Sequence, residues 1–152
     1  MRLVRIGEGG EQLAERIKAV LLPDYVTIYV IGLADDGNDA FERWIAEYTK
    51  ELTMKLKQDF EAEAGGQGKC LIIELADDFS DPFLRAAAAG CWEALRGIVH
   101  TLTLEKRADR IVLNLVRGRN IDIDRIMDAV LFLSDDKSNF CAGCTFDVRC
   151  WR

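Results

Sequence analysis

Residues 86–105 constrain the fold more than any other part of the sequence. The segment reads AAAAGCWEALRGIVHTLTLE, four alanines followed by apolar residues at helical spacing, which predicts one long helix. Shortly before it, residues 70–75 read CLIIEL, an apolar run of the kind found in parallel strands that are covered on both faces. We therefore expect a buried strand that ends near Leu75 and a long helix that packs behind it.

The same alternation of strand and helix runs through the whole chain. It predicts an α/β protein with a parallel sheet, right-handed crossovers and helices on both faces. The 152 residues contain no linker or internal repeat, and we expect a single domain. Strands are expected at residues 4–6, 25–31, 70–75, 110–116 and 145–148, and helices at residues 13–21, 39–63, 86–105 and 121–133.

Composition limits the possible partners. The net charge is −6, whereas a nucleic-acid-binding protein needs a clustered basic face. No apolar run approaches the roughly 20 residues that cross a bilayer. The N-terminal sequence MRLVRIGEGG lacks the apolar segment of a signal peptide. We expect a cytoplasmic protein that binds neither nucleic acid nor membrane.

The five cysteines are expected to be reduced thiols. Cys141 and Cys144 form a C-x-x-C motif, but a zinc site needs a second pair of ligands, and the one histidine, His100, lies in the long predicted helix. A redox pair usually opens a helix, whose dipole lowers the thiol pKa, whereas these cysteines precede a short strand-like run. The sequence therefore favours ordinary buried cysteines over a metal or redox site.

Three segments in the second half of the chain form a recognisable set: HTLTLE, ADRIVLNLVRG and DAVLFLSDDKSNFCAGCTF. They resemble the C-terminal half of short-chain dehydrogenases/reductases, which carry a helix ending in SLALE, a strand like IRVNAVAPG and a segment like AVLFLASDEASFITGQTL. The likeness is good over residues 86–148 and moderate over residues 25–75. Residues 13–17, LAERI, are similar to the IAERL of the family's first helix.

This resemblance implies a reduced Rossmann-like fold. The family's sheet usually has the strand order 3-2-1-4-5-6-7. Here the first predicted helix runs almost directly into a strand that resembles the fourth, so the second and third strands are expected to be missing. Because strand one lies beside strand four in the family, a continuous sheet of about five strands, 1-4-5-6-7, remains. The chain is thus identified as a truncated member of the family.

The resemblance also places the family's catalytic positions on unsuitable side chains. The family uses a tyrosine as general acid and base, assisted by a lysine four residues later. These two positions fall on Ala88 and Trp92. The serine position falls near Leu75 and the asparagine position near Tyr48. We therefore expect no catalytic residues and a catalytically degenerate chain.

The segments that bind cofactor and substrate in the family are altered as well. Residues 7–11, GEGGE, are about two residues shorter than the family's pyrophosphate-binding turn and carry two carboxylates. Arg117 and Gly118 replace the family's proline–glycine turn, and the substrate lid that follows it is missing. We expect this chain to bind no cofactor, and NAD(P) to be bound by a partner subunit.

Acidic residues follow two neighbouring predicted strands. Asp35 and Asp36 follow one strand, and Asp77 and Asp78 follow the next. Ligands of α/β proteins bind at this edge of the sheet, and carboxylates are suitable ligands for Mg²⁺. Helix capping is the other explanation, and Asp81, which precedes a proline, suits it. The sequence favours capping.

Together these features predict a non-catalytic subunit that pairs with an intact, NAD(P)-dependent short-chain dehydrogenase. Heteromeric members of the family combine an active and an inactive subunit, as in the hydroxyacyl-CoA dehydrogenase of the benzylsuccinate route. The resemblance therefore implies a hetero-oligomer of this kind, a heterotetramer. In the family, the helices that resemble residues 39–63 and 86–105 form the subunit contact. The apolar residues expected to serve the core first and this contact second are Trp44, Tyr48, Leu52, Leu95, Ile98, Val99 and Leu102.

A second hypothesis belongs to a different class of function. It is a homodimeric module that binds a small ligand or Mg²⁺ at the acidic edge of the sheet. Loss of a Mg²⁺ response on the substitution Asp77→Asn would favour it over the subunit hypothesis.

Overall fold

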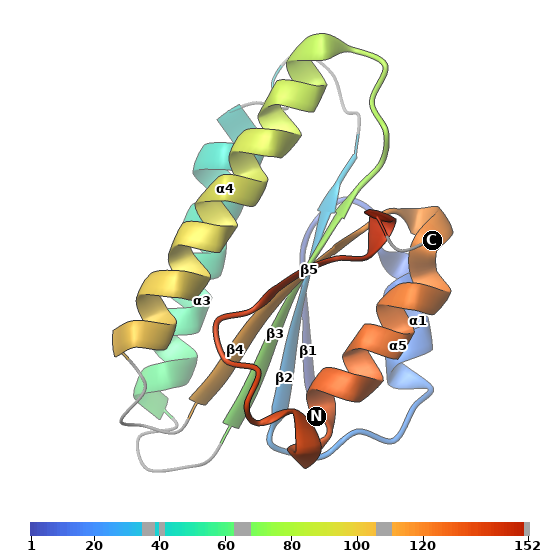
Figure 1. The fold of residues 1–152 in the computed structure, drawn as a ribbon. Helices are drawn as coiled ribbons and strands as arrows, with labels where there is room; N and C mark the ends of the chain where they lie inside the picture. Colours follow the sequence, from blue (N-terminus) through green and yellow to red (C-terminus); the bar gives the residue numbers. More distant parts are fainter. Residues whose placement is uncertain (35–38, 40–41, 63–67, 106–110, 151–152) are drawn as a thin grey trace.

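Five parallel strands form a central sheet in the order β1-β2-β3-β4-β5, so that strands consecutive in sequence lie side by side (Figure 1). The structure is a computed structural model that describes residues 1–34, 39, 42–62, 68–105 and 111–150. The observed order confirms the reduced, five-stranded parallel sheet predicted from the sequence. The strands are β1 (Arg2–Gly7), β2 (Val26–Leu33), β3 (Gly68–Ala76), β4 (Ile111–Gly118) and β5 (Thr145–Asp147).

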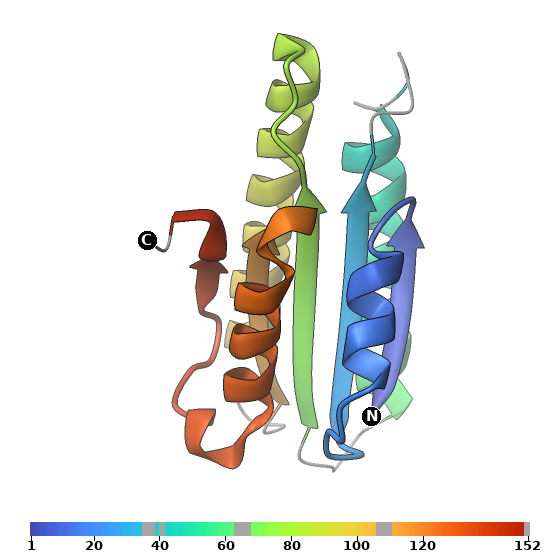
Figure 2. The same cartoon turned by 90° about the vertical axis from the view of Figure 1, so that its right-hand side faces the viewer.

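The predicted helices cover both faces of the sheet (Figure 1 and Figure 2). One face carries η1, α3 and α4, and the other carries α1 and α5. No helix in the described ranges is long and apolar enough to span a bilayer. The helices are α1 (Glu11–Lys18), the π-helix η1 (Arg43–Tyr48), α3 (Thr49–Ala62), α4 (Pro82–Glu105) and α5 (Ile123–Ser134), with short 3-10 helices η3 (Asn120–Asp122), η4 (Asp136–Ser138) and η5 (Val148–Cys150).

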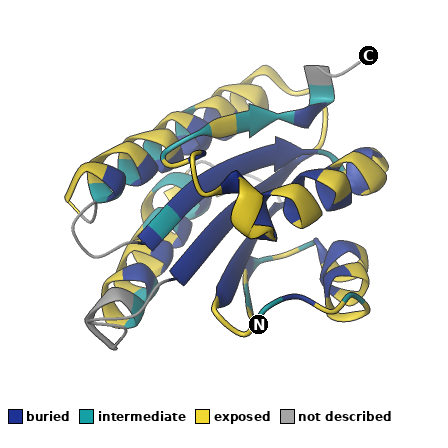
Figure 3. Ribbon diagram, turned by 60° about the horizontal axis from the view of Figure 1, so that its bottom comes forward, coloured by how far each residue is buried: buried dark blue, intermediate teal, exposed yellow. Residues whose placement is uncertain are grey.

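Alternate residues of the strands contribute to two separate apolar cores. On β2, Tyr29 and Ile31 belong to the core under α3 and α4, whereas Ile28 and Val30 belong to the core under α1 and α5. Figure 3 shows the central strands buried along their length and the helices buried only on the side that faces the sheet. This two-sided burial explains why β2 and β3 are apolar at consecutive positions rather than at alternate ones.

Two helix boundaries differ from the sequence prediction. The first helix ends at Lys18, not at residue 21, and Leu21 is fully exposed. Pro23 disfavours helical geometry in the residue before it, which shortens the helix. The long helix begins at Pro82 rather than at residue 86, because Asp81 Oδ1 accepts a hydrogen bond of 2.6 Å from the backbone N–H of Phe83 and caps the helix.

The helix predicted over residues 39–63 contains a π-helical segment at its start. The π-helix η1 precedes the regular helix α3, and the residues immediately before Glu42 lie outside the described part except for Asp39. Trp44 and Tyr48, four residues apart, are both buried. Such widened turns are rare and are often found near functional sites.

Candidate functional site

A pair of opposite charges lies buried at the carboxyl end of the sheet, under α4. Glu74 of β3 and Arg117 of β4 are partners in the parallel register, so both side chains point to the same face. Arg117 Nε lies 2.9 Å from Glu74 Oε1. Glu74 is 0% exposed and Arg117 is 8% exposed. Ligands of α/β proteins bind at this end of the sheet, which makes the pair the centre of the candidate site.

The helix α4 closes over the guanidinium of Arg117. Arg117 Nη2 donates a hydrogen bond of 3.3 Å to the backbone oxygen of Ala88. The guanidinium carbon lies 5.1 Å from the centre of the Trp92 ring, which is the geometry of a cation–π contact. Ala88 and Trp92 are 4% and 9% exposed. The arginine is therefore held between a carboxylate, a carbonyl and an aromatic face.

Burial dominates the electrostatics of Glu74. It raises the pKa of the carboxyl to about 7, against the opposing effects of Arg117 and then Arg149. The contact with Arg117 is short but poorly directed. Among the described residues neither Glu74 oxygen nor Arg117 Nε has a hydrogen bond of good geometry. An ion pair of this kind is costly to desolvate and stabilises the fold weakly.

The row of charges continues to the edge strand. Asp147 of β5 is the register partner of Arg117, and Arg149 contacts it through Nε at 2.8 Å and Nη2 at 2.6 Å. Hydrogen bonding from Arg149 is the main reason why the pKa of Asp147 is lowered. Charges of alternating sign thus cross β3, β4 and β5 from the buried centre to the half-buried edge.

The structure brings together only two of the four positions on which the family's catalytic residues fall. Ala88 and Trp92 both contact Arg117. Leu75 packs on the opposite face of the sheet with the α1 and α5 core. Tyr48 packs with the α3 and α4 core. All four of these residues are buried, and none of the four carries the side chain that the family uses for catalysis.

Glu74 and Arg117 were not predicted as site residues, although the sequence contained a signal for both. Glu74 is the charged residue in the apolar run CLIIEL, and Arg117 is the charged residue in IVLNLVRG. A charged residue inside a strand that is buried on both faces needs a partner. Because β3 and β4 are adjacent and parallel, each of these residues is the other's nearest candidate.

The glycine turn after β1 is explained by packing within the chain. Gly7, Gly9 and Gly10 have φ angles of 77°, 97° and 78°, a region that favours glycine. A Cβ on Gly7 would lie 2.5 Å from the ring of Tyr48. On β2, a Cβ on Gly32 would meet the backbone oxygen of Glu8. The turn therefore lies directly against η1 and the end of β2.

The acidic edge is used for contacts within the chain. Asp77 accepts hydrogen bonds from the backbone N–H of Asn120 at 3.2 Å and from its side-chain amide at 3.1 Å. Asp78 forms an ion pair of 2.6 Å with Arg119. The described ranges contain no group of three or more histidine, cysteine or acidic residues arranged to hold a metal ion. Asp35 and Asp36 lie outside the described residues.

The seven apolar residues predicted for a subunit contact divide into two groups. Two of them, Ile98 and Leu102, are half-buried at the margin of the α3 and α4 core. The other five are buried in the core of the chain; they are Trp44, Tyr48, Leu52, Leu95 and Val99.

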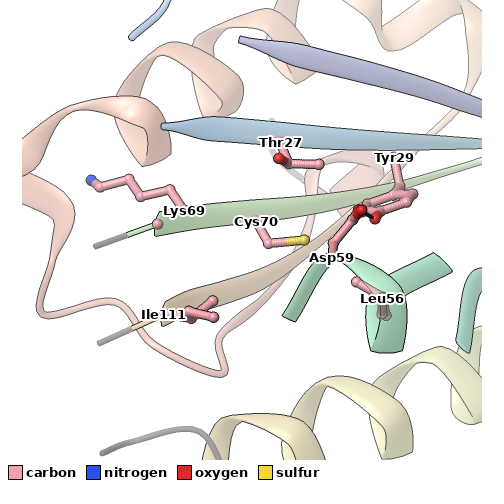
Figure 4. A pocket seen from close by; sticks show the side chains of 8 residues that line it. Thr27, Tyr29, Leu56, Asp59, Lys69, Cys70 and Ile111 are labelled. Atoms are coloured by element: carbon pink, nitrogen blue, oxygen red, sulfur yellow. Dashed lines mark hydrogen bonds between the residues drawn. The ribbon is translucent and has the colours of Figure 1, made fainter. Parts of the chain in front are cut away.

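A small cavity lies at the opposite, amino end of the strands (Figure 4). Its volume is about 10 Å³, room for about one water molecule. Tyr29 donates a hydrogen bond to Asp59 beside it, and Asp59 also forms an ion pair with Arg2. Burial, followed by this hydrogen bond, raises the pKa of Tyr29 above its usual range. The cavity is too small for an organic ligand.

The parallel sheet, its two helical layers and the glycine turn after β1 define a Rossmann-like fold. Solved structures of short-chain dehydrogenase/reductase oxidoreductases share this arrangement, so the fold is of their type. One is an oxidoreductase of that family from Brucella ovis in complex with a partially ordered NAD, with a TM-score of 0.54 and 17% identity over 91% of this chain and 72% of that chain. Another is 4-hydroxyisoleucine dehydrogenase complexed with NADH and succinate, with a TM-score of 0.53 and 17% identity over 90% and 69%.

A third similar structure is that of BdcA (YjgI) from E. coli, with a TM-score of 0.57 and 18% identity. The alignment covers 81% of this chain and 59% of BdcA, so the chain spans less than two thirds of that protein. At these identities the likeness shows the fold alone. No protein-family model and no curated protein sequence matches the chain.

Proposed function

We propose that this chain is a non-catalytic subunit with the fold of a short-chain dehydrogenase. It pairs with an active, NAD(P)-dependent dehydrogenase of the same fold and supports the assembly or the substrate site of that enzyme. The proposed reaction of the complex is the oxidation or reduction of an alcohol and ketone, such as a hydroxyacyl-CoA, with NAD(P) bound by the partner subunit.

The arrangement around Arg117 is the observation that carries this proposal. The resemblance places a catalytic tyrosine and lysine at Ala88 and Trp92. In their place an arginine is inserted between α4 and the sheet, paired with Glu74 and stacked on Trp92. Buried groups that are already paired with one another are poorly suited to exchange protons with a substrate, which requires a positioned acid or base within reach of it.

The turn after β1 supports the same reading for the cofactor. In dinucleotide-binding folds the backbone N–H groups of this turn approach the pyrophosphate closely. Here Gly7 packs against the Tyr48 ring and Glu8 packs against Gly32. Glu11, in the first turn of α1, pairs with Arg5. The first turn of α1 thus already carries a carboxylate, which disfavours a second anion at this helix N-terminus.

The outer face of α3 and α4 is the proposed contact with the partner. Ile98 and Leu102 are half-buried at the margin of the α3 and α4 core, and Met54 of α3 is 54% exposed. A shallow hollow of about 340 Å³ runs along α3 and is lined by Glu47, Lys50, Glu51, Met54, Lys55 and Gln58. Non-obligate interfaces have a similar composition, with apolar residues at the centre and polar or charged residues at the rim.

Two measurements test the proposal. Calorimetry with NAD(H) and NADP(H) should detect no binding by the isolated chain, and binding in the micromolar range would contradict the non-catalytic reading. An intact dehydrogenase from the same source should co-purify with a tagged chain and retain its activity in the complex. If no dehydrogenase is present in the purified material, the proposed pairing is rejected.

A matched pair of variants locates the contact. Met54→Glu places a charge on the outer face of α3 and should weaken pairing at least tenfold. Leu131→Glu makes the same kind of change on α5, where Leu131 is 46% exposed on the other side of the sheet, and should leave pairing unchanged. Equal effects of the two substitutions would refute the proposed face.

The acidic-edge hypothesis has less support. Asp77 and Asp78 already bind Asn120 and Arg119, so a bound Mg²⁺ would have to displace these contacts. A thermal shift with Mg²⁺ that disappears in Asp77→Asn would nevertheless establish that function.

A further inference from the structure

The C-x-x-C motif lies in the connection between α5 and β5. One buried side chain, Asn114 of β4, holds both ends of this four-residue segment. Its Nδ2 donates a hydrogen bond of 2.7 Å to the backbone oxygen of Cys141, and its Oδ1 accepts one of 3.0 Å from the backbone N–H of Cys144. A single carboxamide therefore brings the two cysteine backbones together.

The backbone around the motif is fixed by further contacts. Gly143 has a φ of 72°, and a Cβ at this position would lie 3.1 Å from the side chain of Thr103. Its N–H donates to the backbone oxygen of Leu113 at 2.8 Å, and the oxygen of Cys144 accepts from Leu115 at 2.9 Å. The segment is thus held to β4 on both sides of the bend.

The two cysteines that Asn114 holds together differ in the exposure of their side chains. Cys141 is 7% exposed, whereas Cys144 is half-buried. Burial raises the pKa of the Cys141 thiol, and the neighbouring Cys144 raises it further through its charge and a side-chain hydrogen bond. Cys144 is therefore the thiol within reach of a dissolved reagent, and Cys141 is placed behind it.

We propose that Cys141 and Cys144 form a redox-active dithiol that a low-molecular-weight disulfide oxidises to an intramolecular disulfide. The proposal concerns a site that the proposed subunit function does not use. It also differs from the sequence expectation of ordinary buried cysteines, because that expectation did not include the bridging role of Asn114 or the exposure of Cys144.

The reaction takes place in two exchanges. The Cys144 thiolate attacks one sulfur of the reagent RSSR, which forms a mixed disulfide and releases one RSH. The Cys141 thiolate then attacks the Cys144 sulfur, which forms the Cys141–Cys144 bond and releases the second RSH. Two electrons and two protons pass from the dithiol to the reagent. Both thiols belong to one four-residue segment whose ends Asn114 holds together, so the second step is intramolecular and the mixed disulfide does not accumulate.

Oxidised glutathione is the reagent for the test, applied to the full chain in its folded state. The expected result is a loss of about 2 Da, the mass of two hydrogen atoms, with no lasting glutathione adduct. Peptide mapping should place the disulfide between Cys141 and Cys144, and the other three of the five cysteines should still react with an alkylating agent after unfolding. A persistent glutathione adduct, or a disulfide to another cysteine, would overturn the proposal.

Variants separate the roles of the residues. Cys141→Ser should trap the glutathione adduct on Cys144, whereas Cys144→Ser should leave the protein largely unmodified. Cys150→Ser is the matched control and should lose about 2 Da like the parent chain. Asn114→Ala, checked by circular dichroism for an unchanged fold, should lower the fraction oxidised several-fold at a fixed ratio of reduced to oxidised glutathione. An unchanged fraction in that variant would show that Asn114 does not position the pair.

Discussion

Glu74 and Arg117 face each other across β3 and β4, with 2.9 Å between Glu74 Oε1 and Arg117 Nε and with both side chains buried. Without a partner of opposite charge, each of these two buried positions would be expected to carry an apolar residue. The two charges are compatible with the core only because they lie in the same row of the parallel sheet. The fold thus stabilises an ion pair at the end of the sheet where related folds carry out chemistry.

Removal of the positive partner should be strongly destabilising and dependent on pH. Arg117→Met leaves Glu74 buried without its counter-charge, and breaking a buried pair in this way costs about 3–5 kcal/mol. The cost should be smaller at pH 5 than at pH 8, because the pKa of Glu74 rises further without Arg117 and the carboxyl becomes neutral. Urea unfolding at the two pH values measures this difference.

The double variant Glu74→Leu with Arg117→Met provides the control for that experiment. Replacement of both charges by apolar side chains of similar size is often neutral or stabilising by about 1–4 kcal/mol. The double variant should therefore be more stable than Arg117→Met alone. If it is equally unstable, loss of packing rather than the unpaired charge explains the cost.

The wild-type protein should lose stability as the pH rises toward 7. Burial raises the pKa of Glu74 from its usual value of 4.5 to about 7 in the folded chain, so the folded state binds the proton more tightly than the unfolded state. The stabilising contribution is complete below pH 4.5 and is lost by about pH 7, with a size on the order of 3 kcal/mol. Glu74→Gln removes this titration. The free energy of unfolding of wild type minus that of the variant should therefore fall from pH 5 to pH 8, and a difference that stays constant would contradict the assigned pKa.

Most of the fold was predictable because the periodicity of the sequence is clear. The continuous apolar runs of β2 and β3 reflect burial of both faces of these strands. The helical spacing of apolar residues in α4 reflects burial of one face of the helix. The end of α1 was placed incorrectly because Leu21 continues the helical spacing even though it is exposed. Apolar spacing shows that a residue can face a core but does not show that the chain reaches it.

The site was less predictable than the fold. The positions Ala88 and Trp92 could be found by resemblance, but the side chains that occupy the space between α4 and the sheet come from β3 and β4. That residue 74 meets residue 117 can be seen only when the register of the pairing between β3 and β4 is known. The periodicity of a sequence predicts which face of the sheet a residue points to, but not its partner on the next strand. In the same way, Asn114 could be recognised as a polar residue in a strand, but its two backbone partners could not.

Trp92 should be energetically coupled to Arg117. Its ring lies 5.1 Å from the guanidinium carbon in a buried setting, where a cation–π contact is worth roughly 0.5–2 kcal/mol. Trp92→Leu should destabilise the chain by more than the coupling alone because it also leaves a cavity. A double-mutant cycle with Arg117→Met isolates the coupling, and a coupling energy near zero would show that the two groups only share space.

Two glycines provide a matched test of the turn after β1. Gly7 has a φ of 77°, and an added Cβ would contact the Tyr48 ring, so Gly7→Ala should lower the free energy of unfolding by about 1–2 kcal/mol or more. Gly97 lies on the exposed side of α4, and an added Cβ would have no neighbour within 4 Å among the described residues. Gly97→Ala should therefore stabilise the chain by about 0.4–1 kcal/mol through helix propensity and loss of unfolded-state entropy.

Chemical denaturation of the two variants measures both effects. Because the substitutions add the same methyl group, opposite signs identify the left-handed backbone of Gly7 and its contact with Tyr48 as the cause, and a stabilising Gly7→Ala would contradict both.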